Sequence, residues 1–418
     1  MIDLAVLRET PNALRDALRR RHADIDVDEL MRLDERRRTV RTEAERIRAG
    51  QKAAGKEISS LEGEARRQAI ADAGQLAESY KRLLAEADDL DDEFHTLWIN
   101  VPNMAHPSSP DGTTEEDAVE VRRWGNPADF GFPVRDHQDL GEALGIIDIE
   151  RAVRISGSRF AYLKGKAAEL ELGLVRFAMD RLTANGFTPV IPPVLVRDEA
   201  LFGTGFFPTE RDQVYAVERD ELFLVGTSEV SLAALHLDEI LDEAVLPVRY
   251  AGYSTCFRRE AGTYGKDTGG IFRMHQFNKV EMFSFCHPDR SWEEHEHMLA
   301  IEEQVLQELE LPYRVVNVAV GDLGASAAKK YDIEVWVPSQ EAFREITSCS
   351  NTTDYQARRL RTRFRDESGN RLLHTLNGTV VTSSRTMLAI IENHQQADGS
   401  VRIPPALEPY VGFDAITP

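Results

Sequence analysis

The sequence predicts an α+β fold, in which an antiparallel sheet flanked by helices follows an N-terminal antiparallel coiled-coil arm. Apolar residues recur at steps of three and four in two long segments of the N-terminal third. Short strand-like runs, separated by helices and long connections, fill the remainder, as an antiparallel sheet with flanking helices requires. The sequence has no doubly wound alternation and neither a GxGxxG nor a GxxxxGK[ST] loop, which argues against a Rossmann or P-loop nucleotide site.

The arm is predicted from a heptad seam that occurs twice. The first seam comprises Leu30, Leu33, Arg37, Val40, Ala44, Ile47, Gln51 and Ala54, and the second comprises Ala73, Leu76, Tyr80, Leu83, Ala87, Leu90, Phe94 and Leu97. Turn residues Gly55, Ser59, Ser60 and Gly63 lie between them and let the second helix run back along the first. At ~1.5 Å per residue, such helices project on the order of 40 Å. Heptads more often serve as dimerisation or spacer coils, so this pattern alone leaves the purpose of the arm open.

An irregular connection and then a sheet-forming region follow the arm. The stretch NVPNMAHPSSPDGTTEED, residues 100–117, is rich in proline, serine and glycine and is expected to be irregular. Residues 167–182 have helical apolar spacing. The runs PVIPPVLV, ELFLVG and YRVVNVAV have the character of strands. The domain carrying the chemistry is therefore expected to begin near residue 136.

Length and composition set bounds on the function. A chain of 418 residues with 42% hydrophobic content forms about two domains with a substantial core. Fifty basic and 71 acidic residues give a net charge of −21, so any contact with nucleic acid needs local basic patches. Three cysteines without a CxxC pair argue against a disulfide framework and against zinc. Early charges argue against a signal peptide, and no run approaches the ~20 apolar residues of a membrane span. We expect a cytoplasmic protein.

The most informative stretch is FRREAGTYGKDTGGIFRMHQFNKVE, residues 257–281, which predicts two strands joined by a glycine-rich loop. Alternation along a strand places Arg258 and Glu260 on one face. On the returning strand the shared face carries Arg273, His275, Phe277, Lys279 and Glu281. Arginines, an aromatic ring and carboxylates suit a ligand with phosphates, a flat base and an ammonium group. ATP together with an amino acid fits that description.

These residues resemble motif 2 of the class II aminoacyl-tRNA synthetases, in the version found in bacterial seryl-tRNA synthetases. Four other stretches match the same family in order along the chain. They are GFTPVIPPVLV (residues 186–196, motif 1), LVGTSEVSL (224–232, the serine loop), FREITSCSN (343–351, the metal and ATP segment) and LNGTVVTSSRTMLAIIEN (376–393, motif 3). Five ordered motifs are much more specific than any one of them.

The resemblance implies a serine–tRNA ligase that forms seryl-adenylate from L-serine and ATP and transfers the seryl group to the terminal ribose of tRNA(Ser), and of tRNA(Sec) as well. Arg258, Glu345 and Arg385 are the implied catalytic residues. Arg258 would stabilise charge on the α-phosphate; taken alone, a surface salt bridge to Glu260 would be the simpler interpretation. Arg385 would stack on adenine opposite Phe277. The implied ATP-binding residues are Arg258, Glu260, Arg273, Met274, Phe277, Glu345, Ile346, Thr347, Ser348 and Arg385.

Two further sets of ligands follow from the same resemblance. Glu345 and Ser348 would bind Mg²⁺, the implied cofactor. Their i, i+3 spacing does not place them on one face of a regular strand, so we expect the strand to end near Thr347. Serine would be held by Thr227, Glu229, Arg258, Glu281 and Thr379. A site whose buried polar groups need the hydroxyl of serine rejects alanine. His275 is expected to be a structural hydrogen-bonding residue and the cysteines to be buried packing.

The implied partners are tRNA and a second copy of the chain, with no membrane. Residues 1–105 would form a tRNA-binding domain with the coiled-coil arm, 106–135 a linker and lead-in, and 136–418 the class II catalytic domain. The basic residues of the first arm helix would contact the long variable arm of tRNA(Ser): Arg36, Arg37, Arg38, Arg41, Arg46, Arg48 and Lys52. A homodimer would form through motif 1, including Pro193.

Three positions depart from the family pattern and keep an alternative open. Gly269 stands where bacterial members usually carry arginine, and Val380 and Ser384 stand where small residues are frequent. A specialised, actinobacterial-like paralog, supplying seryl-tRNA to a secondary-metabolite pathway or conferring resistance there, would show such changes. An amino acid:carrier-protein ligase would lack the arm, and a non-catalytic tRNA-binding protein would have lost some of Arg258, Glu345 and Arg385. The arm and all three residues are present.

Overall fold

The computed structural model describes residues 1–262 and 269–418, and these form two compact units, Met1–Pro102 and Asn103–Pro418. Residues 263–268, the greater part of the predicted glycine-rich loop after Arg258, lie outside the described residues. The α-helices of the first unit are α1 (Leu4–Glu9), α2 (Pro11–Arg20), α3 (Val27–Ile58) and α4 (Gly63–Trp98). Asp26 caps α3, because its side chain accepts hydrogen bonds from the backbone N–H groups of Asp28 and Glu29.

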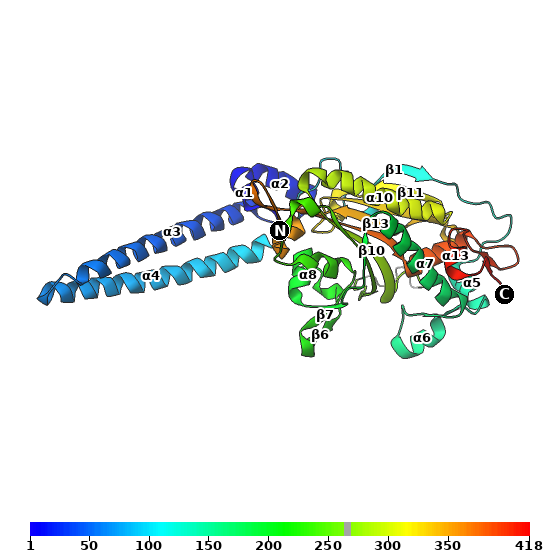
Figure 1. Ribbon diagram of the computed structural model, residues 1–418, viewed down its shortest axis with the longest axis horizontal. Helices are drawn as coiled ribbons and strands as arrows, with labels where there is room; N and C mark the ends of the chain where they lie inside the picture. Colours follow the sequence, from blue (N-terminus) through cyan, green and yellow to red (C-terminus); the bar gives the residue numbers. More distant parts are fainter. Residues whose placement is uncertain (263–268) are drawn as a thin grey trace. The chain divides into compact units, whose positions relative to one another are not determined.

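The predicted helical hairpin is present as α3 and α4, which run side by side in opposite directions (Figure 1). The contacts show the direction, because Arg36 near the start of α3 meets Glu86 late in α4, while Arg48 further along α3 meets Tyr80 earlier in α4. The chain reverses at Ser59–Glu62. Gly55 was predicted to be a turn residue, but it lies inside α3. The hairpin confirms the seam-based prediction of two antiparallel helices.

Most predicted seam positions are withdrawn from solvent, and Leu30, Leu33, Ala87 and Leu90 are buried. The end of the second seam differs from the prediction. Leu97 is 38% exposed, whereas Trp98 is 3% exposed and stacks on Phe94 with ring centroids 5.6 Å apart. Steps of four from Leu90 to Phe94 to Trp98 follow the 3.6-residue helical period, and the large indole buries more surface than leucine.

The second unit is built on an eight-stranded sheet within the described residues, with strand order β1-β11-β12-β13-β16-β10-β9-β4. Every pair in it is antiparallel except β4 with β9, which is parallel. The strands are β1 (Val119–Trp124), β4 (Thr188–Val190), β9 (Val248–Phe257), β10 (Gln276–Cys286), β11 (Tyr313–Asn317), β12 (Lys329–Val337), β13 (Ala342–Asn351) and β16 (His374–Thr382). The predicted antiparallel sheet with flanking helices is therefore confirmed.

Smaller sheets and helices surround this one. The α-helices are α5 (His137–Ala143), α6 (Ile149–Ser156), α7 (Lys166–Ala184), α8 (Asp198–Thr204), α9 (Glu229–Ala233), α10 (Ser291–Glu308), α11 (Tyr355–Leu360), α12 (Ser383–Asn393) and α13 (Glu408–Val411). The short strands are β2 (Ile147–Asp148), β3 (Tyr162–Leu163), β5 (Leu195–Val196), β6 (Ala216–Val217), β7 (Leu222–Leu224), β8 (Ile240–Asp242), β14 (Arg363–Asp366), β15 (Gly369–Leu372), β17 (Val401–Arg402) and β18 (Ala415–Ile416). Among the described residues, no helix has the length and apolar character needed to cross a membrane.

Two expected elements differ in detail. The run PVIPPVLV splits into β4 and β5 around Pro192 and Pro193, because proline cannot donate to a strand ladder. β5 and β7 then pair with each other, outside the large sheet. The segment 106–135, expected to be a linker, contributes β1, which pairs with β11 at the edge of the sheet. The predicted helix over residues 167–182 is present as α7.

The main core lies between one face of the large sheet and helices α7, α10 and α12 (Figure 1). Val280 and Met282 of β10 belong to it and are buried. Because side chains alternate along a strand, their neighbours Lys279 and Glu281 point to the opposite face. One face of the sheet therefore packs against the helices, and the opposite face carries polar side chains; we call this opposite face the polar floor.

Two β-bulges adjust this floor. In β13, Thr347 pairs with Ile333 and Glu345 with Glu334, so Ile346 is the extra residue. In β16, Val381 pairs with Val280 and Thr379 with Glu281, so Val380 is the extra residue. Each bulge shifts the alternation by one, so residues three apart on the bulged strand share a face.

Candidate active site

The residues predicted to form the site surround one cavity over the polar face of the sheet. All fourteen line it: Thr227, Glu229, Arg258, Glu260, Arg273, Met274, Phe277, Glu281, Glu345, Ile346, Thr347, Ser348, Thr379 and Arg385. They come from β10, β13, β16, the start of α9, the start of α12 and the segments that flank the loop after Arg258. Four of the five sequence motifs are thus brought together, whereas residues 186–196 (motif 1) contribute no lining residue.

The predicted strand alternation around Arg258 is wrong in one respect. β9 ends at Phe257 and β10 begins at Gln276, so Arg258, Glu260 and Arg273 lie beyond the strands. The two segments stay joined because the Arg258 N–H donates to the carbonyl of His275 at 3.0 Å and His275 Nδ1 lies 2.9 Å from the carbonyl of Arg258. His275 is the structural hydrogen-bonding residue that we expected.

Arg258 does not form the simple surface ion pair with Glu260. Glu260 instead lies 3.3 Å from Arg273. Arg258 Nε donates to the carbonyl of Gly226 at 3.1 Å, and its guanidinium carbon lies 5.3 Å from the centroid of the Phe277 ring. These contacts hold a partly buried guanidinium at the wall of the cavity.

Glu281 stands at the centre of a small polar cluster. It is 2% exposed, forms an ion pair with Lys279 and accepts a hydrogen bond from Thr227 Oγ1 at 3.2 Å. Lys279 Nζ in turn lies 3.4 Å from Thr379 Oγ1. The bulge at Val380 makes this possible, because it turns Thr379 and Thr382 toward Glu281 and Lys279. Three residues predicted to bind serine therefore converge: Thr227 from the segment before α9, Glu281 from β10 and Thr379 from β16.

Glu229 is a partly buried carboxylate that accepts hydrogen bonds from two amides. Its Oε1 accepts hydrogen bonds from Gln356 Nε2 at 2.7 Å and Asn377 Nδ2 at 2.9 Å, and its backbone N–H donates to Thr227 Oγ1 at 3.2 Å. Burial, reinforced by the negative charge of Glu281, raises the pKa of Glu229 to about 7. A cation placed beside these two carboxylates would relieve that electrostatic cost.

Glu345 and Ser348 share a face, but for a different reason than the one we predicted. The strand does not end near Thr347, since β13 continues to Asn351. The bulge at Ile346 instead places Glu345 and Ser348 opposite Glu334 and Asp332, two residues apart on β12 and hence on one face. Arg385 Nη1 donates to the carbonyl of Glu345 at 2.9 Å and lies 3.3 Å from Glu345 Oε2.

The charges around Glu345 keep it ionised. Burial alone would raise its pKa, but the positive charges of Lys330, Arg385 and Arg258 outweigh that effect and lower the pKa of Glu345 below its ordinary value. Oxygen donors at Glu345 and Ser348 suit Mg²⁺, which usually takes one or two protein ligands together with substrate phosphates and water. Among the described residues, no group of three or more His, Cys, Asp or Glu is arranged to hold a metal, and a site shared with phosphates needs no such group.

Two aromatic rings flank the positions expected to hold adenine. Phe277 lies near Arg258, whereas Arg385 packs over Phe272 with its guanidinium carbon 4.7 Å from the ring centroid. Phe272 and Phe277 both line the cavity. Phe272 was missed in the sequence, although FRMHQF places it one residue before Arg273.

Other residues of the site were also missed. Gln356 and Asn377 donate hydrogen bonds to Glu229, Lys279 forms an ion pair with Glu281, and Lys330 lowers the pKa of Glu345. Asn377 lies in the motif 3 stretch, and Lys279 lies on the polar face that we identified, so both carried a signal. Gln356 lies a few residues after the metal segment, in the helix α11, and is fully buried. An uncharged polar residue in a buried helix is the only signal that its sequence carries.

The three departures from the family pattern have different surroundings. Ser384 lines the cavity, and Val380 is buried at the bulge of β16. Gly269 lines a second cavity with Asp136, Gln138 and other residues, and Phe272 lines both cavities. The three cysteines, Cys256, Cys286 and Cys349, are unpaired and buried, as expected.

The cavity therefore has two chemically different ends. One end carries the carboxylates Glu229 and Glu281 with threonine hydroxyls, and suits an ammonium and a hydroxyl group. The other carries Arg258, Arg273 and Arg385 with two aromatic rings and the Glu345 carboxylate, and suits phosphates, a metal ion and a flat base.

Comparison with known proteins agrees with this arrangement. Residues 213–394 match the tRNA synthetase class II core domain (G, H, P, S and T), and residues 1–105 match the seryl-tRNA synthetase N-terminal domain. The serine–tRNA ligase of Thermobifida fusca is 52% identical over 100% of this chain and 99% of that protein. That of Acidothermus cellulolyticus is 51% identical, with 100% of each chain covered.

Solved structures give the same result. The seryl-tRNA synthetase of Pyrococcus horikoshii complexed with ATP superimposes with a TM-score of 0.96 at 43% identity, covering 100% of both chains. The cytoplasmic serine–tRNA ligase of Naegleria fowleri in complex with AMP has a TM-score of 0.90 at 33% identity, covering 100% of this chain and 99% of that one.

The fold and the motifs are those of a class II aminoacyl-tRNA synthetase. Within that class, the chain belongs to the serine–tRNA ligase family. The full-length matches carry the ordinary name of that enzyme and give no support to the alternative of a specialised paralog.

Proposed function

We propose that this protein activates L-serine with ATP and transfers the seryl group to the terminal ribose of tRNA(Ser), and of tRNA(Sec). The observation that carries the proposal is the polar cluster at the acidic end of the cavity, where Glu281 pairs with Lys279 and Thr227, and Lys279 contacts Thr379. An ammonium and a hydroxyl group fit one end, and a nucleoside triphosphate fits the other. This composition matches serine beside ATP.

In the first step, a carboxylate oxygen of serine attacks the α-phosphorus of ATP, and the bond from that phosphorus to the bridging oxygen of pyrophosphate breaks. Arg258 stabilises the negative charge that builds on the α-phosphate, so no general base is needed. Arg273, Glu260, Met274 and Phe277 hold the nucleotide, with Arg385 on the opposite side of the base. Ile346 and Thr347 contribute to the wall beside them.

Glu345 and Ser348 would hold Mg²⁺, which would supply charge neutralisation for the polyphosphate. Arg385 orients the Glu345 carboxylate through its two contacts with this residue. Lys330 adds the positive charge that keeps Glu345 ionised. These residues shape the phosphate end whether or not the ion is present.

Serine is selected by polar groups. Glu229, together with Thr227, takes the ammonium group, and Glu281 and Thr379 take the hydroxyl. Alanine would leave the buried Glu281 without that partner, which is costly. Threonine would be excluded because its methyl group has no space among these side chains.

In the second step, a hydroxyl of the terminal ribose attacks the carbonyl carbon of the adenylate, and AMP leaves. We assign residues 1–105 to tRNA binding through the arm, 106–135 to the lead-in and 136–418 to catalysis. Among the described residues, every residue that lines the cavity belongs to 204–385 and none to the hairpin, which supports this division.

We further propose a homodimer that forms through residues 186–196, including Pro193. Ile191 is 83% exposed, and Pro193 beside it is exposed as well. An apolar side chain so open to solvent is expected where a second chain covers it. Ile191→Asp should lower the molar mass measured by light scattering from that of a dimer to that of a monomer.

The decisive experiment is serine-dependent exchange of pyrophosphate into ATP, repeated with and without tRNA(Ser), followed by charging of the tRNA. Arg258→Ala should abolish exchange. Arg259→Ala is the matched control, because Arg259 is exposed and does not line the cavity. Exchange with alanine in place of serine, or no exchange at all by the unmodified protein, would contradict the proposal.

A further inference from the structure

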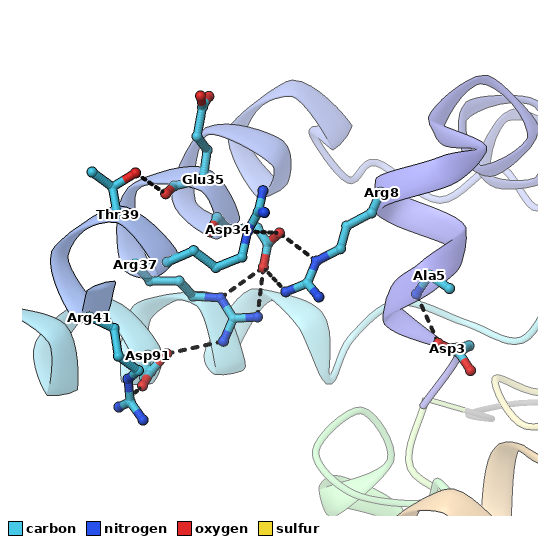
Figure 2. Close-up of polar contacts among 10 residues, drawn as sticks. Asp3, Ala5, Arg8, Asp34, Glu35, Arg37, Thr39, Arg41 and Asp91 are labelled. Atoms are coloured by element: carbon cyan, nitrogen blue, oxygen red, sulfur yellow. Dashed lines mark hydrogen bonds and ion pairs between the residues drawn. The ribbon is translucent and has the colours of Figure 1, made fainter. Parts of the chain in front are cut away.

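The root of the coiled-coil arm contains a buried carboxylate, Asp34, in the second turn of α3. Asp34 is 2% exposed, and aspartate is rarely so buried unless it is paired. Arg8 of α1 approaches it side-on, with Nε and Nη2 each 2.8 Å from a carboxylate oxygen. Arg37 donates to Oδ1 through Nε at 3.0 Å and Nη2 at 2.6 Å. Figure 2 shows both guanidinium groups meeting this one carboxylate.

The contacts continue from Asp34 into the second helix of the arm. Arg37 Nη1 lies 3.0 Å from Asp91 Oδ1 of α4, and the Arg37 guanidinium carbon lies 4.2 Å from the centroid of the Phe94 ring. Arg41 also reaches Asp91, at 2.5 Å (Figure 2). Asp34 and Arg37 therefore connect α1, α3 and α4 through charge-assisted hydrogen bonds, which are stronger and more directional than neutral ones.

These pairings divide the seven basic residues expected to contact RNA. The four nearest the root are paired with acidic residues: Arg36 with Glu86, Arg37 with Asp34 and Asp91, Arg38 with Asp34, and Arg41 with Asp91 and Asp88. A phosphate would have to compete with a carboxylate for each of them. Further out, Arg46 pairs with Glu43 on its own helix, whereas Arg48 contacts the hydroxyl and ring of Tyr80, which leave its charge intact. We call Arg48 and Lys52 the outer basic residues.

We infer that Asp34 is a positioning residue that fixes the direction of the arm relative to α1 and α2, so that the root arginines brace the arm and the outer basic residues contact the RNA. This inference rests on the proposed role of the arm in tRNA binding. Burial alone would raise the pKa of Asp34, but the hydrogen bonds from Arg8 and Arg37 lower it to about 2. The carboxylate is therefore charged at neutral pH. Without it, Arg8 would lose its counter-charge, and Arg37 would keep only the one that Asp91 supplies.

The direct test is a distance measurement within the first unit. Spin labels at Ala13→Cys on α2 and Ser60→Cys at the tip report the direction of the arm; both positions are exposed, whereas the three native cysteines are buried. The distance distribution should broaden in Asp34→Asn. Arg46→Gln should leave it unchanged, because Arg46 is 76% exposed and pairs with Glu43 on its own helix.

The functional test separates the two half-reactions. Asp34→Asn should lower kcat/KM for tRNA charging by roughly 10- to 100-fold, since small misplacements of a substrate have effects of that size, and should leave serine-dependent pyrophosphate exchange unchanged. If Asp34→Asn fails to fold, Arg8→Gln removes one guanidinium at the 39%-exposed rim and serves the same comparison. Failure of exchange in the unmodified protein would count against the proposed function and not against this inference.

Salt dependence distinguishes bracing from RNA contact. Each arginine or lysine that contacts a phosphate contributes about 1 to the slope of log Kd against log salt concentration. Lys52→Gln and Arg48→Gln should each reduce that slope, whereas Arg37→Gln should weaken binding with the slope unchanged. A reduced slope in Arg37→Gln, or a narrow distance distribution with normal charging in Asp34→Asn, would overturn the inference.

Discussion

Buried carboxylates in this chain differ in charge according to their hydrogen-bond partners. Arginines surround Asp34 and lower its pKa to about 2, whereas amides surround Glu229, and burial raises its pKa to about 7. Burial also raises the pKa of Glu302, beneath the sheet, well above the ordinary value. Burial opposes ionisation in all three cases, so the partner decides the outcome. The same side-chain chemistry thus provides a fixed charge at the arm and a titratable group in the cavity.

Because we propose that Glu229 receives the serine ammonium group, serine binding is expected to depend on pH. Below a pKa of about 7 the carboxyl is protonated and neutral, and it attracts the serine ammonium less. Affinity should therefore rise with pH through neutrality, and serine should bind roughly tenfold more weakly at pH 6 than at pH 8. Calorimetry in buffers of different ionisation enthalpy should detect proton release near pH 7 that disappears by pH 8. Equal affinity and no proton release across this range would contradict the assignment.

Replacing Glu281 should separate recognition from folding. Glu281→Gln keeps the size of the side chain and should reduce serine-dependent exchange by roughly 10²-fold, because a charged acceptor for the hydroxyl is lost. Glu281→Ala should reduce exchange at least as much and also lower the melting temperature, since Lys279, 6% exposed, loses its counter-charge. An exchange rate near that of the unmodified protein in Glu281→Gln, at saturating serine, would remove Glu281 as the serine-reading residue.

At the scale of single elements, two bulges account for the geometry of the site. Ile346 and Val380 are each the extra residue in a ladder, and each brings residues three apart onto the cavity face. Glycine has a related role at Gly378 of β16. A Cβ there would lie 2.6 Å from Glu302 Oε1 and 3.1 Å from Met282 Cε. The strand approaches the helix beneath it too closely for any side chain.

A matched pair of glycine substitutions tests this packing. Gly378→Ala should destabilise the protein by about 1–3 kcal/mol, the usual cost of overpacking. Gly74→Ala in α4 should stabilise the arm by about 0.5–1 kcal/mol, since a Cβ there meets nothing within 4 Å and alanine favours helix. Urea unfolding monitored by circular dichroism measures both. A neutral Gly378→Ala would show that Glu302 can move aside.

The elements differ in how far the sequence alone predicts them. The hairpin follows from heptad spacing, which is a local property of each helix, so the sequence predicts both helices, although the turn is shorter than expected and the buried seam ends at Trp98 instead of Leu97. The bulges were not, because an extra residue is defined by the register between strands distant in the sequence, and nothing distinguishes Ile346 from any other apolar strand residue. The site residues lie within recognisable motifs, so the sequence identifies them. The contact of Gln356 with Glu229 lies outside these motifs, and the sequence does not predict it. That contact depends on a helix whose placement is set by tertiary packing.

At the scale of the whole molecule, the arm and the cavity occupy separate compact units. The arm contains the basic residues that we assign to RNA, and the second unit contains every predicted serine and ATP ligand. A net charge of −21 gives no general attraction to tRNA, so binding must depend on local groups. The two half-reactions should therefore be separable by shortening the arm.

Replacing residues 45–83 with a short Gly/Ser turn should test this separation. The replacement keeps Asp34, Arg37 and Asp91, so the root of the arm is preserved. Serine-dependent pyrophosphate exchange should remain within about twofold of the unmodified protein, because the deleted residues touch no part of the cavity. Charging of tRNA should fall by roughly 10²-fold or more as phosphate contacts are lost. Parallel losses in both assays would mean that the arm stabilises the catalytic unit instead.

The order of strands in the large sheet has a consequence for how the protein is made. β16 is the last of the eight strands along the chain, yet it lies between β13 and β10 and hydrogen-bonds to both. Until β16 leaves the ribosome, β4, β9 and β10 form one partial sheet and β1, β11, β12 and β13 another. A nascent chain complete to Asn351 thus holds Glu281 and Glu345 on two unconnected pieces. Local helices such as the arm can fold earlier during translation, but the cavity can close only when translation is nearly complete.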